Sequence, residues 1–289
     1  MTLTERPLAF PCAGHQLYGI LTLPTNPSSR GVLVIVGGPQ TRTGSHRQFT
    51  LLARHLAAQG IPVFRFDYRG MGDSEGEPRT FEDVSEDIRA AADCFMREAP
   101  ELRELVLWGL CDAASAALFH AHQDPRVTGL VLVNPWVRTG EGAAKAYLKH
   151  YYRARLFDSG FWGKLLRGGF DFRASVRSFA RLVRQAGGRQ EGSSGDGTAR
   201  AGEVAPLSLP DRMAEGLRRF SGRVLVILSG NDLTAREFAD VARATRKWRR
   251  LMRSERVRVV DLPGADHTFS RREWRDRVAG WTEEWVHEG

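Results

Sequence analysis

Three side chains that together could carry out nucleophilic catalysis occur in the order cysteine, aspartate, histidine, at Cys111, Asp232 and His267. Cys111 lies where an apolar, strand-like run at 105–108 breaks at Gly109 and an alanine-rich, helix-like run begins. A strand, a sharp turn and a helix expose a nucleophile at the turn, and the backbone N–H that follows it points at the oxyanion of an acyl-transfer reaction. The sequence therefore predicts a cysteine nucleophile at this turn.

The acid and the base of the set each follow a strand-like run. Asp232 comes after the run 224–228, and His267 comes after the run 257–261. We expect His267 to take the proton of the Cys111 thiol and to deliver it to the leaving group, while Asp232 holds the imidazole tautomer and stabilises its charged form. The alternatives for the acid are three other aspartates, Asp240, Asp261 and Asp266.

Backbone N–H groups would hold the oxyanion. The amide of Asp112 is the expected first donor, because it directly follows the nucleophile. A glycine loop after the run 32–36 would supply the second, and since the proline in that loop has no N–H, Gly38 is the expected donor with Gln40 in reserve. The Asp112 carboxylate opposes formation of a Cys111 thiolate unless it points away or pairs with a base.

Each of these assignments has a structural alternative. A cysteine at the end of a strand is often only a small buried apolar residue. An aspartate in a loop, such as Asp232, often caps a helix or a turn. Ser115 lies one helical turn beyond Cys111 and would be the nucleophile if the turn were shifted.

The elements that must position these residues alternate along the chain. Apolar strand-like runs are separated by amphipathic helix-like runs, which is typical of the α/β class with a mostly parallel, twisted sheet and helices on both faces. Strands are expected at 16–23, 32–36, 63–66, 105–108, 130–133, 224–228 and 257–261. Because such sheets bind ligands at the carboxyl ends of their strands, we expect Cys111, Asp232 and His267 to meet at one edge.

One region breaks this alternation. Residues 138–210 have no strand signal but many aromatic and basic residues, so we predict a helical cap inserted into a core of residues 1–137 and 211–289, with a flexible loop near 187–203. Between residues 138 and 190, twelve Lys or Arg stand against three Asp or Glu, whereas the formal net charge of the whole chain is +8. The cap either packs its aromatic side chains on the core as a lid or meets an anionic, partly apolar partner.

Composition excludes several classes of protein. The 289 residues are 42% hydrophobic and 26% charged, which is enough for a large core. Cys12, Cys94 and Cys111 show neither a disulfide pattern nor metal-type spacing, and no run is long and apolar enough for a membrane span. The N-terminal residues lack the apolar region of a signal peptide, so we expect a cytoplasmic location. We expect no cofactor and no metal. We also expect no nucleic acid partner, because no base-reading motif accompanies the basic charge.

Taken together, these motifs resemble the α/β-hydrolase superfamily over nearly the whole chain outside the cap. Residues 67–74 resemble the D-x-R-G-x-G-x-S loop of that family, and residues 109–115 with the loop 36–40 are similar to the type-one exosortase A system-associated hydrolases of bacterial exopolysaccharide gene clusters. The resemblance implies a cytoplasmic hydrolase that works beside exopolysaccharide and protein-sorting machinery. A cysteine nucleophile is also similar to dienelactone hydrolases. Two positions depart from the pattern: Ala113 replaces a glycine, and Val36 stands where many relatives carry a histidine.

Three hypotheses for the function follow. An acyl-cysteine is a thioester, which forms most easily from an activated acyl group, so we favour hydrolysis of a carboxylic ester or thioester of a small acyl substrate, either anionic or carrier-linked. An acyltransferase of the same mechanism is an alternative. A second alternative is a catalytically weak binding or scaffold protein, which contacts a membrane surface or another protein through its basic cap. This last hypothesis can be tested by reversing the charges of four arginines in the cap, Arg153, Arg155, Arg181 and Arg184.

Overall fold

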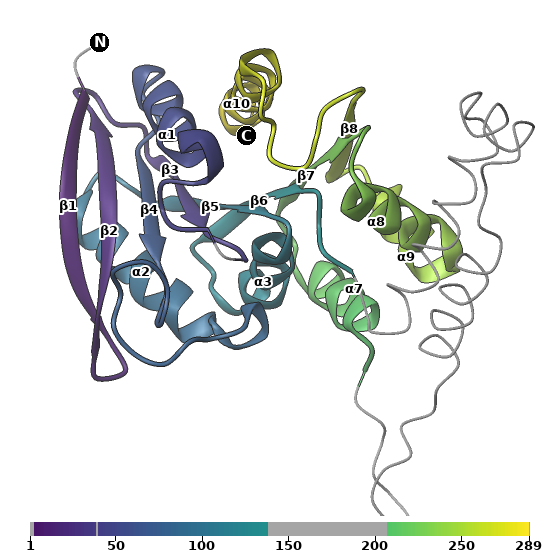
Figure 1. Ribbon diagram of the computed structural model, residues 1–289, viewed down its shortest axis with the longest axis horizontal. Coiled ribbons are helices and arrows are strands. Elements are labelled where there is room, and N and C mark those ends of the chain that lie inside the picture. The colour runs from purple at the N-terminus through teal and green to yellow at the C-terminus, as the bar shows by residue number, and fades with distance from the viewer. Residues whose placement is uncertain (1–2, 39, 138–206, 289) are drawn as a thin grey trace, which may run out of the picture. The chain divides into compact units, whose positions relative to one another are not determined.

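A single sheet organises the chain in the computed structural model, which describes residues 3–38, 40–137 and 207–288. Within these residues eight strands pair in the order β1-β2-β4-β3-β5-β6-β7-β8 (Figure 1). The bounds are β1 (Leu3–Cys12), β2 (His15–Pro24), β3 (Arg30–Ile35), β4 (Val63–Asp67), β5 (Glu104–Leu110), β6 (Val127–Val133), β7 (Arg223–Ser229) and β8 (Val257–Leu262). β2 pairs antiparallel with β1 and β4, and every other neighbouring pair is parallel. The predicted α/β class with a mostly parallel sheet is confirmed.

The sequence analysis missed β1. This strand lies at the edge of the sheet and is mostly exposed, and it contains Pro7 and Pro11, which cannot donate to a ladder. It is joined to β2 by a two-residue turn in which Ala13 and Gly14 have φ angles of 46° and 83°. A strand with proline and little burial has no clear apolar alternation, so its place in the sheet depends on pairing with β2.

Helices cover the sheet. Their bounds are α1 (Gln48–Ala58), α2 (Ser85–Glu98), α3 (Asp112–His120), α7 (Leu209–Arg219), α8 (Leu233–Ala244), α9 (Arg246–Met252) and α10 (Arg272–His287). Figure 1 shows α1 and α10 on one side of the sheet and α2 and α3 on the other, and each pair is in contact. No helix of the described part of the chain combines the length and the apolar character that crossing a bilayer requires.

The predicted helical cap lies outside the described residues, apart from its last four positions, which include the start of α7. The core is one compact unit made from two distant stretches of chain, 1–137 and 210–289. These stretches meet inside the sheet, where β6 pairs in parallel with β7.

The central strands are buried on both faces. β3, β5, β6 and β7 are built from apolar residues that are almost entirely inaccessible to solvent, as expected for parallel strands covered on both sides. Full burial of each such aliphatic side chain is worth about 1.5–3 kcal/mol. The parallel strands end at one edge of the sheet, where six loops begin, after β3, β4, β5, β6, β7 and β8.

Candidate active site

Cys111 lies on a strained turn between β5 and α3. Its φ and ψ angles are 64° and −125°, a conformation that a residue with a side chain rarely adopts. Its N–H donates to the Val133 carbonyl at 2.9 Å, and its carbonyl accepts from Trp136 N at 3.1 Å. A side chain at Gly109 would place its Cβ 2.6 Å from the backbone of Ala113. The start of α3 therefore packs directly on β5, and the sharp turn leaves the Cys111 side chain half-buried.

Asp232 begins α8 and contacts the predicted histidine. Its carboxylate accepts from the backbone N–H groups of Thr234 and Ala235, at 3.2 and 3.1 Å, as a helix cap does. Its Oδ2 atom also lies 2.9 Å from Nδ1 of His267. The helix-cap interpretation and the acid interpretation of Asp232 thus apply to the same carboxylate. Asp266, an alternative acid, instead accepts from Ser270 N at 3.0 Å.

His267 contacts both other members of the predicted set. Hydrogen bonds to Asp232 and then to Cys111 raise the pKa of its imidazole to about 10, although burial acts in the opposite direction. The ring is therefore an imidazolium at neutral pH. A histidine beside a cysteine sulfur can act as the base and acid partner of that nucleophile. The structure brings Cys111, His267 and Asp232 together at the carboxyl edge of the sheet.

The glycine loop after β3 meets the start of α3. The Gly38 N–H, the expected second donor, lies beside the residue that follows the nucleophile, but it donates to the Asp112 carboxylate, with 2.9 Å between N and Oδ2. The Ala113 N–H donates to Oδ1 of the same group at 3.0 Å. Burial raises the pKa of Asp112, although these two N–H groups and the His267 charge act in the opposite direction. The carboxylate of Asp112 therefore pairs with backbone amides rather than with a basic side chain.

Gln40, the reserve donor, is engaged within its own loop. Its N–H donates to the Gly37 carbonyl at 3.2 Å. Its side-chain oxygen accepts from Ser45 N at 3.2 Å and from Gln48 Nε2 at 3.1 Å. These bonds tie the glycine loop to the start of α1, so Gln40 braces the loop that carries Gly38.

Asn134 is a site residue that the sequence analysis missed. It follows β6 with a φ angle of 45°, and its side chain is fully buried. Its Oδ1 accepts from Ser229 N at 2.8 Å, and its Nδ2 donates to Ser229 Oγ at 2.9 Å and to the His267 carbonyl at 3.3 Å. Asn134 therefore joins the end of β6 to the end of β7 and to the histidine loop. The signal in the sequence is a lone polar residue directly after a buried strand.

Ser115, the alternative nucleophile, is fully buried in α3. Its hydroxyl donates to the Trp136 carbonyl at 2.6 Å. The hydroxyl thus anchors the segment after β6 and has no access to solvent. In the residues that the structure describes, no group of three His, Cys, Asp or Glu side chains is arranged to hold a metal ion.

The loop after β4, which carries the D-x-R-G-x-G-x-S resemblance, is braced by ion pairs. Arg69 pairs with the buried Asp87 at 2.8 Å, and the Ser74 hydroxyl donates to the Asp67 carbonyl at 2.6 Å. Arg42, which follows the glycine loop, pairs with the Asp67 carboxylate. These contacts hold the two loops together beside the site without touching the three predicted catalytic side chains.

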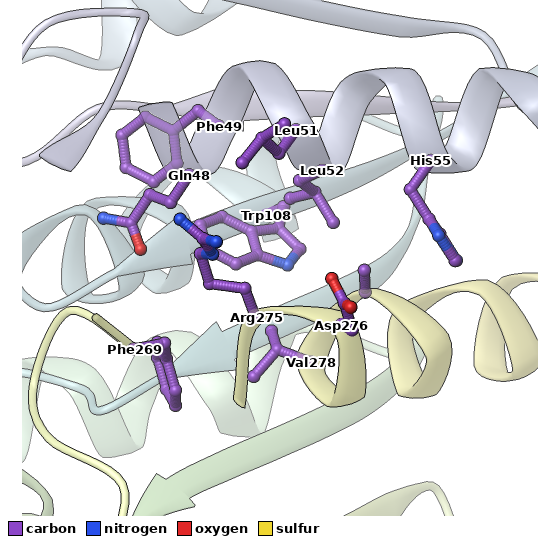
Figure 2. A pocket seen from close by; sticks show the side chains of 11 residues that line it. Gln48, Phe49, Leu51, Leu52, His55, Trp108, Phe269, Arg275, Asp276 and Val278 are labelled. Carbon is purple, nitrogen blue, oxygen red and sulfur yellow. The ribbon is translucent and has the colours of Figure 1, made fainter. Parts of the chain in front are cut away.

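A small cavity of about 40 Å³ lies between α1 and α10. Figure 2 shows the indole of Trp108 between these two helices. Its Nε1 donates to Thr282 Oγ1 at 3.4 Å, and its ring packs edge-on against Phe49, with 5.6 Å between ring centroids. Since one water needs about 10–15 Å³, the cavity has room for only a few waters. None of the three predicted catalytic residues lines it, so it belongs to the packing of α1 on α10.

Comparison with known proteins gives the following matches. A family model described as the alpha/beta hydrolase family matches residues 32–281. Among solved structures, an esterase of Pyrococcus furiosus superposes with a TM-score of 0.65 at 14% identity, over 99% of this chain and 91% of its own. A dienelactone hydrolase from Anabaena variabilis superposes with a TM-score of 0.62 at 15% identity, over 100% of this chain and 99% of its own. At these identities the likeness shows the fold alone.

Curated relatives match over a shorter segment. A polyketide transferase of a Penicillium species is 32% identical over 90 residues, which is 30% of this chain and 31% of the relative. The quorum-quenching protein AidA of Acinetobacter baumannii is 29% identical over 93 residues, or 31% of each chain. The chain thus matches just under a third of the length of these relatives.

Proposed function

This chain is an enzyme of the alpha/beta hydrolase family, since its residues 32–281 match the model of that family, and from this premise we propose that it cleaves carboxylic esters or thioesters through an acyl-enzyme on Cys111. The observation that carries the proposal is the position of His267, whose Nδ1 lies 2.9 Å from Asp232 Oδ2 and whose pKa is raised by Asp232 and, next, by Cys111. The esterase of Pyrococcus furiosus has the same fold.

The first half of the reaction forms the acyl-enzyme. The Cys111 thiolate attacks the carbonyl carbon, and the electron pair of the carbonyl bond moves to oxygen. The N–H groups of Gly38 and Asp112 stabilise that oxyanion. When the tetrahedral intermediate collapses, the bond to the leaving alcohol or thiol breaks, and the departing anion takes the proton of the His267 imidazolium.

The second half releases the acid. Neutral His267 takes a proton from a water molecule, whose oxygen attacks the thioester carbonyl. Collapse of this second intermediate breaks the bond between carbon and sulfur, so the Cys111 thiolate and the His267 imidazolium are restored. Asp232 stabilises the imidazolium in both halves and does not itself take the proton.

Acyl transfer is the second candidate. In that reaction an alcohol or thiol replaces water as the acceptor, and the same three side chains perform the same steps. The match to a polyketide transferase of a Penicillium species and to one of Penicillium crustosum supports it. A thioester acyl-enzyme also favours it, because a thioester passes its acyl group to an alcohol or thiol more readily than an ester does.

The finer expectations of the sequence analysis belong to the same proposal. The substrate is a small acyl compound, anionic or carrier-linked, and the basic charge of the cap predicted at 138–210 suits such a substrate. The enzyme works in the cytoplasm of a bacterium beside exopolysaccharide and exosortase systems. The resemblance of residues 109–115 and 36–40 to the hydrolases of those systems supports this assignment.

Mass spectrometry of labelled protein tests the nucleophile. Wild type, Cys111→Ala and His267→Ala are treated with iodoacetamide near pH 7, and the adduct is located by peptide mapping. Cys12 and Cys94 are internal controls, because they are buried and burial raises the pKa of their thiols. We expect fast alkylation at Cys111 that slows in His267→Ala.

Turnover is measured in parallel on activated esters and acyl thioesters, with and without an added alcohol or thiol acceptor. Hydrolysis that disappears in Cys111→Ala supports the hydrolase, and acylated acceptor supports the transferase. Alkylation of Cys111 no faster than that of Cys12, together with no turnover above the Cys111→Ala control, contradicts both and favours the binding or scaffold hypothesis.

A further inference from the structure

One of the two N–H groups assigned to the oxyanion donates to a side chain of the enzyme itself. Gly38 N donates to Asp112 Oδ2, with 2.9 Å between the two atoms. The Ala113 N–H donates to the other oxygen of the same carboxylate, Oδ1, at 3.0 Å. A carboxylate is an anion whose single negative charge is shared by two oxygens, and it accepts from the same N–H donors as an oxyanion does. The Asp112 carboxylate thus occupies the Gly38 N–H, on which the substrate oxyanion is expected to depend.

The glycine loop is shaped around this carboxylate. A Cβ at Gly37 would lie 2.1 Å from Asp112 Oδ1 and 2.9 Å from Ala113 N. Contacts this short do not occur between real atoms, so any side chain at Gly37 would force the carboxylate or the loop to move. A Cβ at Gly38 would meet nothing within 4 Å. The absence of a side chain at Gly37 is therefore what lets the carboxylate lie against the loop.

The surroundings of Asp112 act on its charge in opposite directions. Burial raises the pKa of the carboxyl and so opposes its charge, whereas the Gly38 and Ala113 N–H groups and the His267 charge favour it. The negative charge of Asp112 in turn helps to raise the pKa of the buried Tyr68 hydroxyl to about 12, after the larger effect of burial. The phenol therefore stays neutral and adds no competing charge. The Cys111 thiolate and the Asp232 carboxylate are the neighbouring groups that the proposed chemistry requires to be negative.

We propose that Asp112 is an internal occupant of the oxyanion site, whose carboxylate must be displaced by the carbonyl oxygen of a substrate before Cys111 can react productively. The proposal rests on the acyl-enzyme chemistry proposed above and names a residue that determines specificity. Small esters bring little binding energy to displace a charged, hydrogen-bonded carboxylate. Larger acyl substrates, which make further contacts, displace it more readily, so Asp112 selects against small esters.

Replacing Asp112 empties the site in a way that can be measured without turnover. In Asp112→Ala the amides of Gly38 and Ala113 lose their carboxylate partner and become free to bind another small anion. Formate is the probe, because it presents the same two oxygens. We expect millimolar formate to shift the amide NMR resonances of Gly38 and Ala113 in Asp112→Ala and to leave them in place in wild type.

Activity gives the second readout. With a small activated ester such as p-nitrophenyl acetate, kcat/KM should rise by about tenfold to a hundredfold in Asp112→Ala, the range that one charge-assisted hydrogen bond spans. Formate should inhibit this variant and spare the wild type. Asp112→Asn, which is neutral and of the same size, should show a smaller gain in kcat/KM. This variant replaces Asp112→Ala in both assays if the alanine variant does not fold.

Glu273→Ala is the matched control. Glu273 is exposed and lies in the first turn of α10, so its loss removes one negative charge from a helix N-terminus and leaves the Asp112 carboxylate and its two N–H donors in place. We expect this variant to behave as wild type in both assays. A change in Asp112→Ala that Glu273→Ala shares would be an effect of net charge and would overturn the proposal.

The remaining outcomes separate this proposal from the proposed function. If formate shifts the Gly38 amide equally in wild type and Asp112→Ala, the site is already open and the proposal is wrong. If Cys111 is alkylated fast in both proteins but the variant gains no activity, the proposal is also wrong while the proposed function stands. If neither protein turns over any ester, the proposed function fails, and the formate titration still decides whether Asp112 occupies the two donors.

Discussion

Oδ2 of Asp232 lies 2.9 Å from Nδ1 of His267, and the same carboxylate caps the first turn of α8. The two backbone N–H groups of the cap hold the carboxylate in one orientation before any substrate binds. The imidazole that pairs with it is therefore oriented by the helix as well as by its own loop. Preorganisation of this kind limits the reorganisation required during the reaction.

Asp232→Asn should separate the catalytic contribution of this carboxylate from its structural one. Asparagine still caps a helix, so the free energy of unfolding should change little, but a neutral amide cannot stabilise the imidazolium, and kcat/KM should fall about 10²–10⁴-fold. Asp232→Ala should lose the activity and about 0.5–2 kcal/mol of stability as well. Asp266→Asn is the control, because Asp266 bonds to Ser270 and not to the imidazole. An equal loss of activity in Asp266→Asn would contradict the assignment.

The His267 ring should titrate far above the ordinary imidazole value. Its pKa, raised to about 10 by Asp232 and Cys111, should be visible in the NMR shift of the imidazole C–H protons. In Cys111→Ala one of the two stabilising partners is gone, so the pKa should fall but remain above about 6.5, because Asp232 is still present. A pKa that does not differ between wild type and Cys111→Ala would show that the sulfur does not contact the ring.

The same raised pKa makes part of the stability depend on pH. Since the pKa of His267 is higher in the folded protein than near 6.5 in the unfolded chain, protonation favours the folded state. The stabilisation is fully present below about pH 6.5 and is lost as the pH rises through about 10. The difference in unfolding free energy between wild type and His267→Gln, from urea titrations at several pH values, should shrink over this interval. A difference that is constant with pH would count against the charged imidazole.

Asn134→Asp should weaken both the fold and the reaction. Aspartate tolerates the φ angle of 45°, but it loses the amide donors to Ser229 and to the His267 carbonyl and places a buried charge there. The expected cost is about 1–3 kcal/mol of unfolding free energy, with a lower kcat because the histidine loop is held less firmly. Ser229→Ala, which removes one partner hydroxyl, should have a smaller effect on both. Wild-type kcat in Asn134→Asp would argue against a positioning role.

Gly37→Ala should couple to Asp112. Because a Cβ at Gly37 would clash with Asp112 Oδ1, the single substitution should destabilise the protein, and removing the carboxylate in the double variant should recover part of the loss. A double-mutant cycle of urea unfolding should give a coupling energy of about 0.5–3 kcal/mol. Recovery stays partial, since the Ala113 N atom would also lie 2.9 Å from the new Cβ. Additive effects would place the Asp112 side chain away from the loop.

Much of the architecture could be predicted from local pattern. Seven of the strands coincide with apolar runs. For the central strands the reason is that a strand buried on both faces needs apolar residues at nearly every position. The turn at Cys111 could also be predicted, because a strand that packs against the start of a helix requires Gly109 and small residues after it. β1 was not predicted, because its prolines and its exposure remove the apolar alternation that identifies a strand.

The order and types of the residues alone thus determined the α/β class and the three candidates Cys111, Asp232 and His267. Only the tertiary structure decided which aspartate meets the histidine, 35 positions away in the chain, and that Asp112 meets Gly38, 74 positions away. The physical reason is that a hydrogen bond needs atoms within about 3 Å and a suitable angle. Strand order, parallel register and side-chain rotamers set those distances, and none of them is a property of neighbouring residues in the chain.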